Sequence, residues 1–211
     1  MQHTLEENPL VSNMPRTAVQ IVTDPKKIKL LADPVRREII RQTVTQPQTQ
    51  NQLADKLELR PSSISHHLKM LREADFIKIG RSEVGTHGIL EKYYEPTSNL
   101  FIEDYKNAPA RLQKYFVHTN IERLRGMLSM LQILAEKRNK TIEITREELK
   151  DMAQEVANRL PVIAKKYEKT QTDATRETLI IRIYSEALLS IMKDSRWKKI
   201  FAGIVDRRLI Q

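Results

Sequence analysis

The stretch from residue 50 to residue 80 constrains the fold most, because it contains two short helical patterns separated by a tight turn. In the first pattern, Leu53 and Leu57 supply apolar contacts one helical turn apart, and Thr49 precedes them as an N-cap residue. A second helix is expected to begin at Pro61, because proline suits the first helical position, where its missing N–H is not needed. Two short helices joined in this way are typical of a helix-turn-helix motif.

Helical geometry separates the two faces of the second helix. At about 100° per residue, one face is an apolar stripe and the opposite face is polar. The apolar stripe contains Ile64, Leu68 and Leu71, with His67 at its edge. Short hydrogen-bonding side chains can reach base edges or phosphates in a major groove, although ordinary surface helices carry such residues too. The polar face contains Ser62, Ser65, His66 and Lys69.

A β-hairpin is expected to follow the second helix. The residues Phe76, Ile77 and Ile79 favour a strand, residues 80–88 form a polar loop with glycines, and residues 89–94 favour a return strand. Such a hairpin is the wing of a winged helix, and its cations can lie against the phosphate backbone or enter a minor groove. The alternative is that these cations are simply exposed to solvent and do not contact DNA. The cations are Lys78, Arg81, His87 and Lys92.

The segment LLADPVRREIIRQTVTQPQTQNQLADKLELRPSSISHHLKMLREADFIKIG resembles the winged-helix core of ArsR-type transcription regulators. The similarity covers residues 25–96, and the long wing sequence HGILEKYYEPT resembles that of some archaeal-like members. The resemblance implies a homodimeric DNA-binding regulator that responds to a signal. By position, it makes His67 a partly packed histidine and assigns DNA-facing roles to Ser62, Ser63, Ser65, His66 and Lys69.

The same family often senses metal ions, but this chain lacks the residues for it. There is no cysteine, which excludes a thiolate site, and the five histidines show none of the HxxH, DxH or ExxH spacings. The adjacent His66 and His67 point to different sides of a helix and do not easily chelate one ion. We therefore expect no metal site and no cofactor.

Composition favours a nucleic-acid partner, and the sequence argues against an enzyme, a membrane protein and a secreted protein. The formal net charge is +9, distributed as −1 over residues 1–23, +3 over residues 24–96 and +7 over residues 97–211. The excess positive charge of residues 97–211 either lies near phosphates or simply keeps the surfaces of long helices hydrated. No GxSxG, P-loop, HExxH or dinucleotide fingerprint is present, so we expect no enzyme. No apolar run has the length of a membrane span, and the polar N-terminus is no secretory signal, so a cytoplasmic protein without membrane contact is expected.

Two cap-plus-proline pairs complete the first domain. Asp24 with Pro25 and Asp33 with Pro34 each predict a helix start. Residues 18–22 predict a strand or an arm. The core is expected to combine apolar residues of these helices with those of the motif, namely Ile28, Leu31, Val35, Ile39, Ile40, Leu53, Leu57, Ile64, Leu68 and Leu71.

Beyond Pro96 the pattern becomes helical. Residues 96–109 are expected to be a connector with a short helical piece at residues 101–105, followed by a long helix over residues 110–137. This helix carries apolar residues at alternating spacings of four and three, as in a coiled-coil seam. The seam is either a stripe of the chain's own core or, as we favour, a dimer contact. Its residues are Val117, Ile121, Leu124, Leu128 and Leu131.

The rest of the chain predicts more helices. Residues 141–144 favour a brief strand, Thr145 and Glu148 form a capping box, and Pro161 is expected to kink or end the helix that follows. A final helical region carries a wide apolar face. The tail with Trp197 is expected to pack on its own domain, and the alternative is a membrane-surface helix. Methionines can line an adaptable pocket for an unidentified small-molecule effector, although they more often belong to a core. The methionines in question are Met127, Met130, Met152 and Met192.

These patterns predict a mainly α fold with a small β-wing. We expect a flexible arm at residues 1–17, a winged helix-turn-helix DNA-binding domain at residues 18–96 and an all-helical dimerisation domain at residues 97–211. The expected function is a sequence-specific transcription regulator that binds double-stranded DNA as a homodimer. Its recognition helices would enter half-sites about 34 Å apart, or a multiple of that distance, in a pseudo-palindromic site. The alternatives are a winged-helix protein-interaction or assembly module and a nonspecific nucleic-acid binder.

Overall fold

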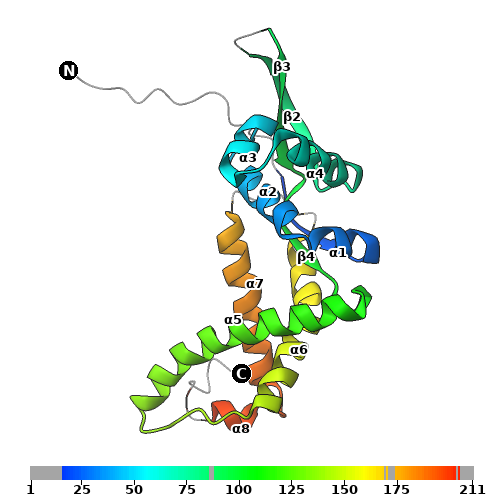
Figure 1. Cartoon of the computed structure of the whole chain (residues 1–211). Coiled ribbons are helices and arrows are strands. Elements are labelled where there is room, and N and C mark those ends of the chain that lie inside the picture. Colours follow the sequence, from blue (N-terminus) through cyan, green and yellow to red (C-terminus); the bar gives the residue numbers. More distant parts are fainter. Residues whose placement is uncertain (1–15, 86–87, 169, 171–173, 203, 205–211) are drawn as a thin grey trace, which may run out of the picture. The chain divides into compact units, whose positions relative to one another are not determined.

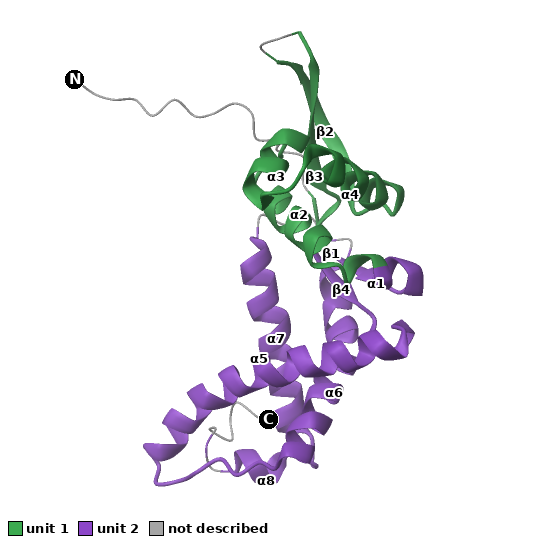
Figure 2. Ribbon diagram, viewed as in Figure 1, with its two compact units in different colours: residues 1–17, 30–99, 171–173 green, residues 18–29, 100–170, 174–211 purple. Residues whose placement is uncertain are grey.

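The computed structural model describes residues 16–85, 88–168, 170, 174–202 and 204. It is mostly helical, with a wing-like β-hairpin and a long helical C-terminal region, as the sequence predicted (Figure 1). The chain divides into two compact units, here called the winged unit (residues 1–17, 30–99 and 171–173) and the helical unit (residues 18–29, 100–170 and 174–211), shown in Figure 2. No helix of the described residues is long and apolar enough to cross a membrane.

Three helices form the body of the winged unit: α2 (Pro34–Thr45), α3 (Gln50–Leu57) and α4 (Pro61–Glu73). Asp33 caps α2 by accepting from the N–H of Arg36, and Thr49 with Gln52 makes a complete capping box at α3. The three helices pack on one another and bury the apolar stripes that the sequence predicted. The buried residues include Ile39, Ile40, Leu53, Ala54, Ile64, Leu68, Leu71, Phe76 and Ile77, whereas Val35 and Leu57 are only half-buried.

The wing is an antiparallel hairpin of β2 (Ile77–Val84) and β3 (Leu90–Pro96). An isolated bridge from Gln48 to Tyr94 ties β3 to the segment before α3. The expected loop over residues 80–88 is wrong in its first half, because β2 continues through residue 84. Cross-strand pairing extends the strand there, since each residue from Arg81 to Val84 has a partner on β3.

A second pair of strands begins the helical unit. Strand β1 (Thr17–Val22) pairs with β4 (Ser98–Glu103), and α1 (Pro25–Leu31) follows β1. The helical piece expected at residues 101–105 is wrong, because alternate residues of β4 are buried and its backbone pairs with β1. Only the short turn η1 (Tyr105–Asn107) is helical there. This pairing groups residues 18–29 with the helical unit, which differs from the expected span of 18–96 for the first domain.

Four helices and a short turn complete the helical unit: α5 (Ala110–Glu136), α6 (Arg146–Ala164), η2 (Lys165–Tyr167), α7 (Arg176–Lys193) and α8 (Lys198–Phe201). The capping box of Thr145 and Glu148 is confirmed. The strand expected at residues 141–144 is wrong, because these residues form no strand. An end of the helix at Pro161 is also wrong, because α6 continues for three more residues, while a kink at Pro161 stays a prediction.

The apolar seam of α5 takes part in the core of its own unit. Leu124 and Leu128 are buried there, and the other three seam residues, Val117, Ile121 and Leu131, are half-buried against the same core. Met152, Met192 and the half-buried Met127 also belong to this core, while Met130 is exposed, so the methionines do not line one common pocket. The tail packs on its own unit as expected, since Trp197 and Phe201 are buried in the core.

Candidate nucleic-acid interface

The polar face of α4 is exposed, because its opposite face supplies the core. Ile64, Leu68 and Leu71 are buried, and Ser62, Ser63, Ser65, His66 and Lys69 are all exposed. On the helix, Ser62, Ser65, His66 and Lys69 lie on the same side, whereas Ser63 lies well round the helix from Ser65. The structure therefore groups four of the five predicted helix residues on one surface.

A tight turn fixes where α4 begins. Glu58 ends α3 in the left-handed conformation, with φ 53°, and the N–H of Leu59 donates back to the carbonyl of Ala54. The side-chain amide of Gln50 donates to the carbonyl of Pro61 at 3.1 Å, which links the starts of the two helices. The exposed N-terminus of α4 thus lies beside the N-terminus of α3. Two helix N-termini side by side favour a phosphate.

A groove of about 610 Å³ runs between these helices and the wing. It is lined by the start of α3, by Ser65, Leu68, Lys69 and Arg72 of α4, and by residues 85, 89–92 and 94 of the wing. Of the predicted residues of α4, Ser62, Ser63 and His66 are exposed but are not among the lining residues of this groove. Three cations and one carboxylate are among its lining residues, so the groove favours an anionic ligand. The cations are Lys69, Arg72 and Lys92, and the carboxylate is Glu91.

The groove also contains residues that the sequence did not single out. Gln50 and Asn51 line it from the first turn of α3, and Arg72 lines it from α4. Arg72 was detectable, since it lies three residues after Lys69 and so shares a helix face with it. Gln50 and Asn51 were not detectable, because only the folded wing shows that the start of α3 faces the groove.

The wing cations differ in what they contact. Lys92 is exposed and lines the groove. Lys78 forms an ion pair with Glu95, with 3.3 Å between Nζ and Oε1. Arg81 pairs with Glu83, with 2.9 Å between Nε and Oε1, and its guanidinium lies 4.0 Å from the centre of the Tyr93 ring. His87 lies outside the described residues. Among the described predicted wing residues, Lys92 is therefore the one that the groove contains.

A buried carboxylate anchors the base of the wing. The side chain of Glu95 is 2% exposed and lies within ion-pair distance of both Lys78 and Arg16. A Cβ at Gly80 would lie 2.6 Å from Cδ of Glu95, so a larger residue there would force the buried Glu95 side chain to move. The register shifts at this point, between Ile79 and Arg81. Such an irregularity re-aims the outer part of a strand.

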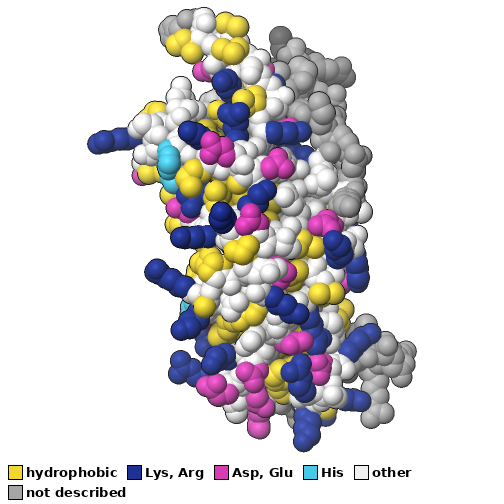
Figure 3. All heavy atoms as spheres, turned by 90° about the vertical axis from the view of Figure 1, so that its right-hand side faces the viewer, with side chains coloured by type: hydrophobic (Ala, Val, Ile, Leu, Met, Phe, Trp, Pro, Cys, Tyr) yellow, Lys and Arg dark blue, Asp and Glu magenta, His cyan; other side chains and the backbone are white. Residues whose placement is uncertain are grey.

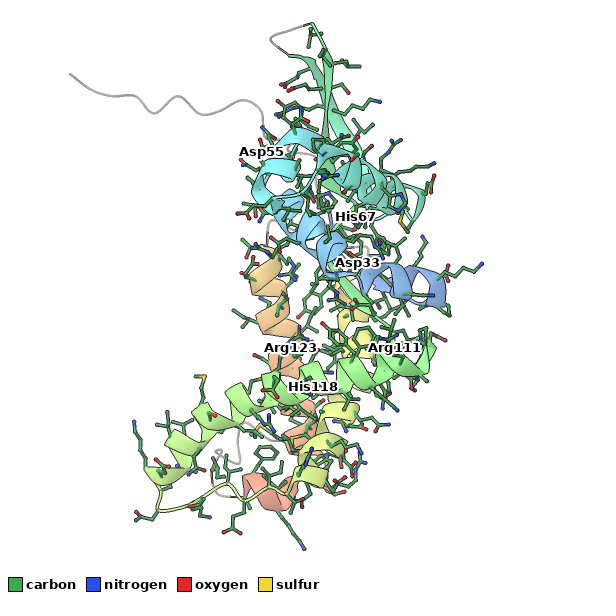
Figure 4. All side chains as sticks on the ribbon, in the orientation of Figure 1. Asp33, Asp55, His67, Arg111, His118 and Arg123 are labelled. Carbon is green, nitrogen blue, oxygen red and sulfur yellow. The ribbon has the colours of Figure 1, made fainter. Side chains whose placement is uncertain are left out.

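His67 lies against the start of α2 and not on the polar face of α4. Burial lowers the pKa of His67, and the neighbouring Asp33 partly opposes that shift. Figure 4 shows both side chains between α4 and the start of α2. Within the part of the chain that the structure describes, the buried Nδ1 of His67 has no hydrogen-bond partner. A neutral, partly packed ring suits a structural histidine.

The described residues contain no group of three or more His, Cys, Asp or Glu that would hold a metal ion. Figure 3 shows Lys and Arg side chains spread over this face of the molecule, with a histidine among those of the winged unit. The hydrogen-bonding and charged side chains that line the groove allow hydrogen bonds and cation–anion attraction.

Comparison with known proteins agrees with this geometry. A family model described as a helix-turn-helix domain matches residues 31–79, which span α2, α3, α4 and the start of β2. Residues 31–79 are a helix-turn-helix domain. A search of curated proteins found no match. The domain indicates a DNA-binding regulator, and such domains are typically not enzymes.

Proposed function

We propose that this chain is a sequence-specific transcription regulator of the ArsR type that binds double-stranded DNA as a homodimer. The matching helix-turn-helix family includes ArsR-type regulators. The observation that carries the proposal is the groove between α4 and the wing, which combines hydrogen-bonding side chains with three cations. A groove of this composition fits a duplex, because phosphates need cations and base edges need donors and acceptors.

Within this proposal, the contacts divide into two kinds. Ser65 and His66 lie on the exposed side of α4 and read base edges in the major groove. Lys69 and Lys92 bind phosphates on either side of the groove. The hydroxyl groups of Ser62 and Ser63, at the N-terminus of α4, bind another phosphate. Lys78 and Arg81 contribute less, because their ion pairs with Glu95 and Glu83 compete with DNA.

Selection from sheared genomic DNA tests the proposal. We would incubate the full-length protein with the fragments at about 0.15 M salt, where nonspecific phosphate binding is weak, and sequence those retained. Enrichment of a shared inverted repeat supports a dimeric sequence reader. Recovery of unselected fragments supports a nonspecific binder, and recovery of none supports a protein-interaction module; both results contradict the proposal.

The homodimer requires a surface that is open to a second copy. The expected seam is largely used within the chain's own core, with Leu124 0% exposed. The opposite side of α5 carries Met130, Ile133 and Leu134, which are exposed and lie on one helix face. We propose that this outer face of α5, and not the seam, is the dimer contact.

Sedimentation of two variants tests this contact. Met130→Glu with Ile133→Glu places charges on the outer face, and we expect a monomer. Val162→Glu with Ile181→Glu, at exposed positions of α6 and α7, is the control and is expected to remain a dimer. Monomeric wild-type protein, or a dimer that persists in the first variant, would contradict the proposed contact.

A hollow in the helical unit is our candidate for an effector. It has a volume of about 390 Å³ and is lined on one side by Val117 and Ile121 of α5 and on its rim by Lys114, His118 and Lys150. An apolar floor with a basic rim suits a small organic anion. Salicylate and benzoate are suitable probes. We expect them to change backbone hydrogen exchange at residues 110–121 and not in the Val117→Asp variant, and an unchanged exchange pattern would contradict this role.

A further inference from the structure

Three large apolar side chains are exposed at the far end of the wing. Val84, Ile89 and Leu90, here called the tip patch, are 72%, 67% and 57% exposed. Val84 and Leu90 are direct cross-strand partners, so they lie on the same face of the hairpin. Figure 3 shows hydrophobic side chains gathered at this end of the molecule. Among the described residues of the winged unit, these three side chains are exposed and add little to the core.

The tip patch continues the groove that faces DNA. Ile89 and Leu90 line the groove together with Lys92, and Lys92 lies on the same face of β3 as Leu90. Lys69 and Arg72 line the same groove from α4. The patch is therefore the apolar end of a surface that is otherwise basic and polar. An anionic partner fits the cations along this surface better than an apolar protein does.

The hairpin has the length to reach a second groove of the same duplex. Strand β2 has eight residues, and at about 3.3 Å per residue it spans about 26 Å. The major groove of B-DNA is about 12 Å wide. With α4 in a major groove, this length is enough for the end of the hairpin to pass one phosphate backbone and reach the neighbouring minor groove.

We propose that the tip patch enters this minor groove and bends the duplex. This inference rests on the proposed DNA binding. Aliphatic side chains make no hydrogen bonds to base edges, and in a minor groove they act as wedges that partly unstack a base step and bend the duplex toward the major groove. Pyrimidine–purine steps such as TA unstack most easily. The tip patch therefore makes the protein prefer sites that carry such a step where the wing enters, although no side chain forms a hydrogen bond to those bases.

The test compares two pairs of substitutions in the full-length protein. Val84→Thr with Leu90→Thr makes the tip polar while it keeps residues that favour a strand. Val162→Thr with Ile181→Thr is the control, since Val162 is also 72% exposed and Ile181 is 66% exposed, both on helices of the helical unit. The DNA is a selected genomic site labelled at both ends, and energy transfer between the labels measures its bend.

We expect wild type and control to bend the site equally and the tip variant to lose at least half of the bend. Its affinity falls about tenfold, and replacing a flanking TA step by GC weakens wild type more than the tip variant. The dependence of affinity on salt stays unchanged, because no charge is removed. An unbent wild-type complex, or an equal bend with the tip variant, overturns the inference while specific binding still stands.

Two further outcomes distinguish DNA from the other possible partners of the tip patch. If the tip variant changes the sedimentation of the free protein, the patch binds a second copy, which also overturns the inference. If wild type binds no DNA selectively, the proposed function is overturned, and this inference, which rests on it, is overturned with it. Wild type that binds selectively and bends the site supports both statements.

Discussion

Helix α4 in the winged unit leaves a polar face open, whereas α5 in the helical unit turns its most regular apolar seam inward. Both patterns have helical periodicity, and both were visible in the sequence. For α4 the periodicity separates a core face from an exposed polar face, and the structure keeps that separation. For α5 the same reasoning identifies the apolar face but not what covers it. For Leu124 and Leu128, the core of the helical unit covers it. A periodic seam therefore indicates burial, and other observations must identify what covers it.

The largest expected effect compares the two faces of α5. Leu124→Ala removes a fully buried side chain from the core, and we expect the free energy of unfolding to fall by about 2–5 kcal/mol. Ile133→Ala, on the exposed face, changes it by less than about 0.5 kcal/mol in the monomer. Urea unfolding followed by the fluorescence of Trp197, the single tryptophan, measures both. Equal losses would show that the seam is no more buried than the outer face.

A smaller effect is expected at the base of the wing. Gly80→Ala brings a methyl group against the carboxyl group of Glu95, and we expect a loss of about 1–3 kcal/mol together with faster backbone hydrogen exchange in β3. Gly126→Ala is the matched control, because nothing lies within 4 Å of the added Cβ in α5. That helical substitution is expected to stabilise by up to about 1 kcal/mol. A harmless Gly80→Ala would contradict the role of the buried carboxylate.

The two capping boxes allow a direct comparison of the units. Thr49→Ala removes the cap of α3 and Thr145→Ala that of α6, and each is expected to cost about 1 kcal/mol. Backbone hydrogen exchange shows which helix loses stability in each variant. Only Thr49→Ala is expected to weaken DNA binding, because the start of α3 lines the groove. Loss of DNA binding with Thr145→Ala instead would argue that the helical unit contacts DNA.

The smallest effect concerns pH and the helical unit. Hydrogen bonds from Arg196 and Arg159 lower the pKa of Asp194 to about 2, from an ordinary value of 3.8. Because the folded pKa is lower than the unfolded one, the stabilisation is complete above about pH 4 and is lost as pH falls toward 2. Asp194→Asn is expected to flatten this part of the pH profile of unfolding. Ser195→Ala, at the exposed neighbouring position, is the control, and an unchanged profile in Asp194→Asn would contradict this assignment.

Local signals explain why the winged unit was predictable. The caps at Asp33 and Thr49, and the prolines at the starts of α2 and α4, act within one helical turn, so the sequence alone places these helices. The same holds for the capping box at Thr145. The candidate helix residues followed from periodicity, and their exposure agrees with it. Their roles in DNA binding remain a prediction.

Nonlocal contacts explain what the sequence did not provide. Strand β4 is short, and its pairing with β1 joins residues about eighty positions apart, so it was taken for a connector. The outer half of β2 is polar and gains its order from partners on β3. The positions of Lys78 and Arg81 depend on Glu95, Glu83 and Tyr93, which become neighbours only in the folded wing.

The most direct test of sequence reading by α4 is the ratio of affinities for the selected site and for random DNA. We expect Ser65→Ala and His66→Ala to lower this ratio by about tenfold while binding to random DNA changes little. Lys92→Ala is expected to weaken binding to both DNAs and to reduce the salt slope by about one. Lys193→Ala, at an exposed position of α7, is the control. Equal losses on both DNAs for Ser65→Ala and His66→Ala would contradict the assignment of α4 as the reading helix.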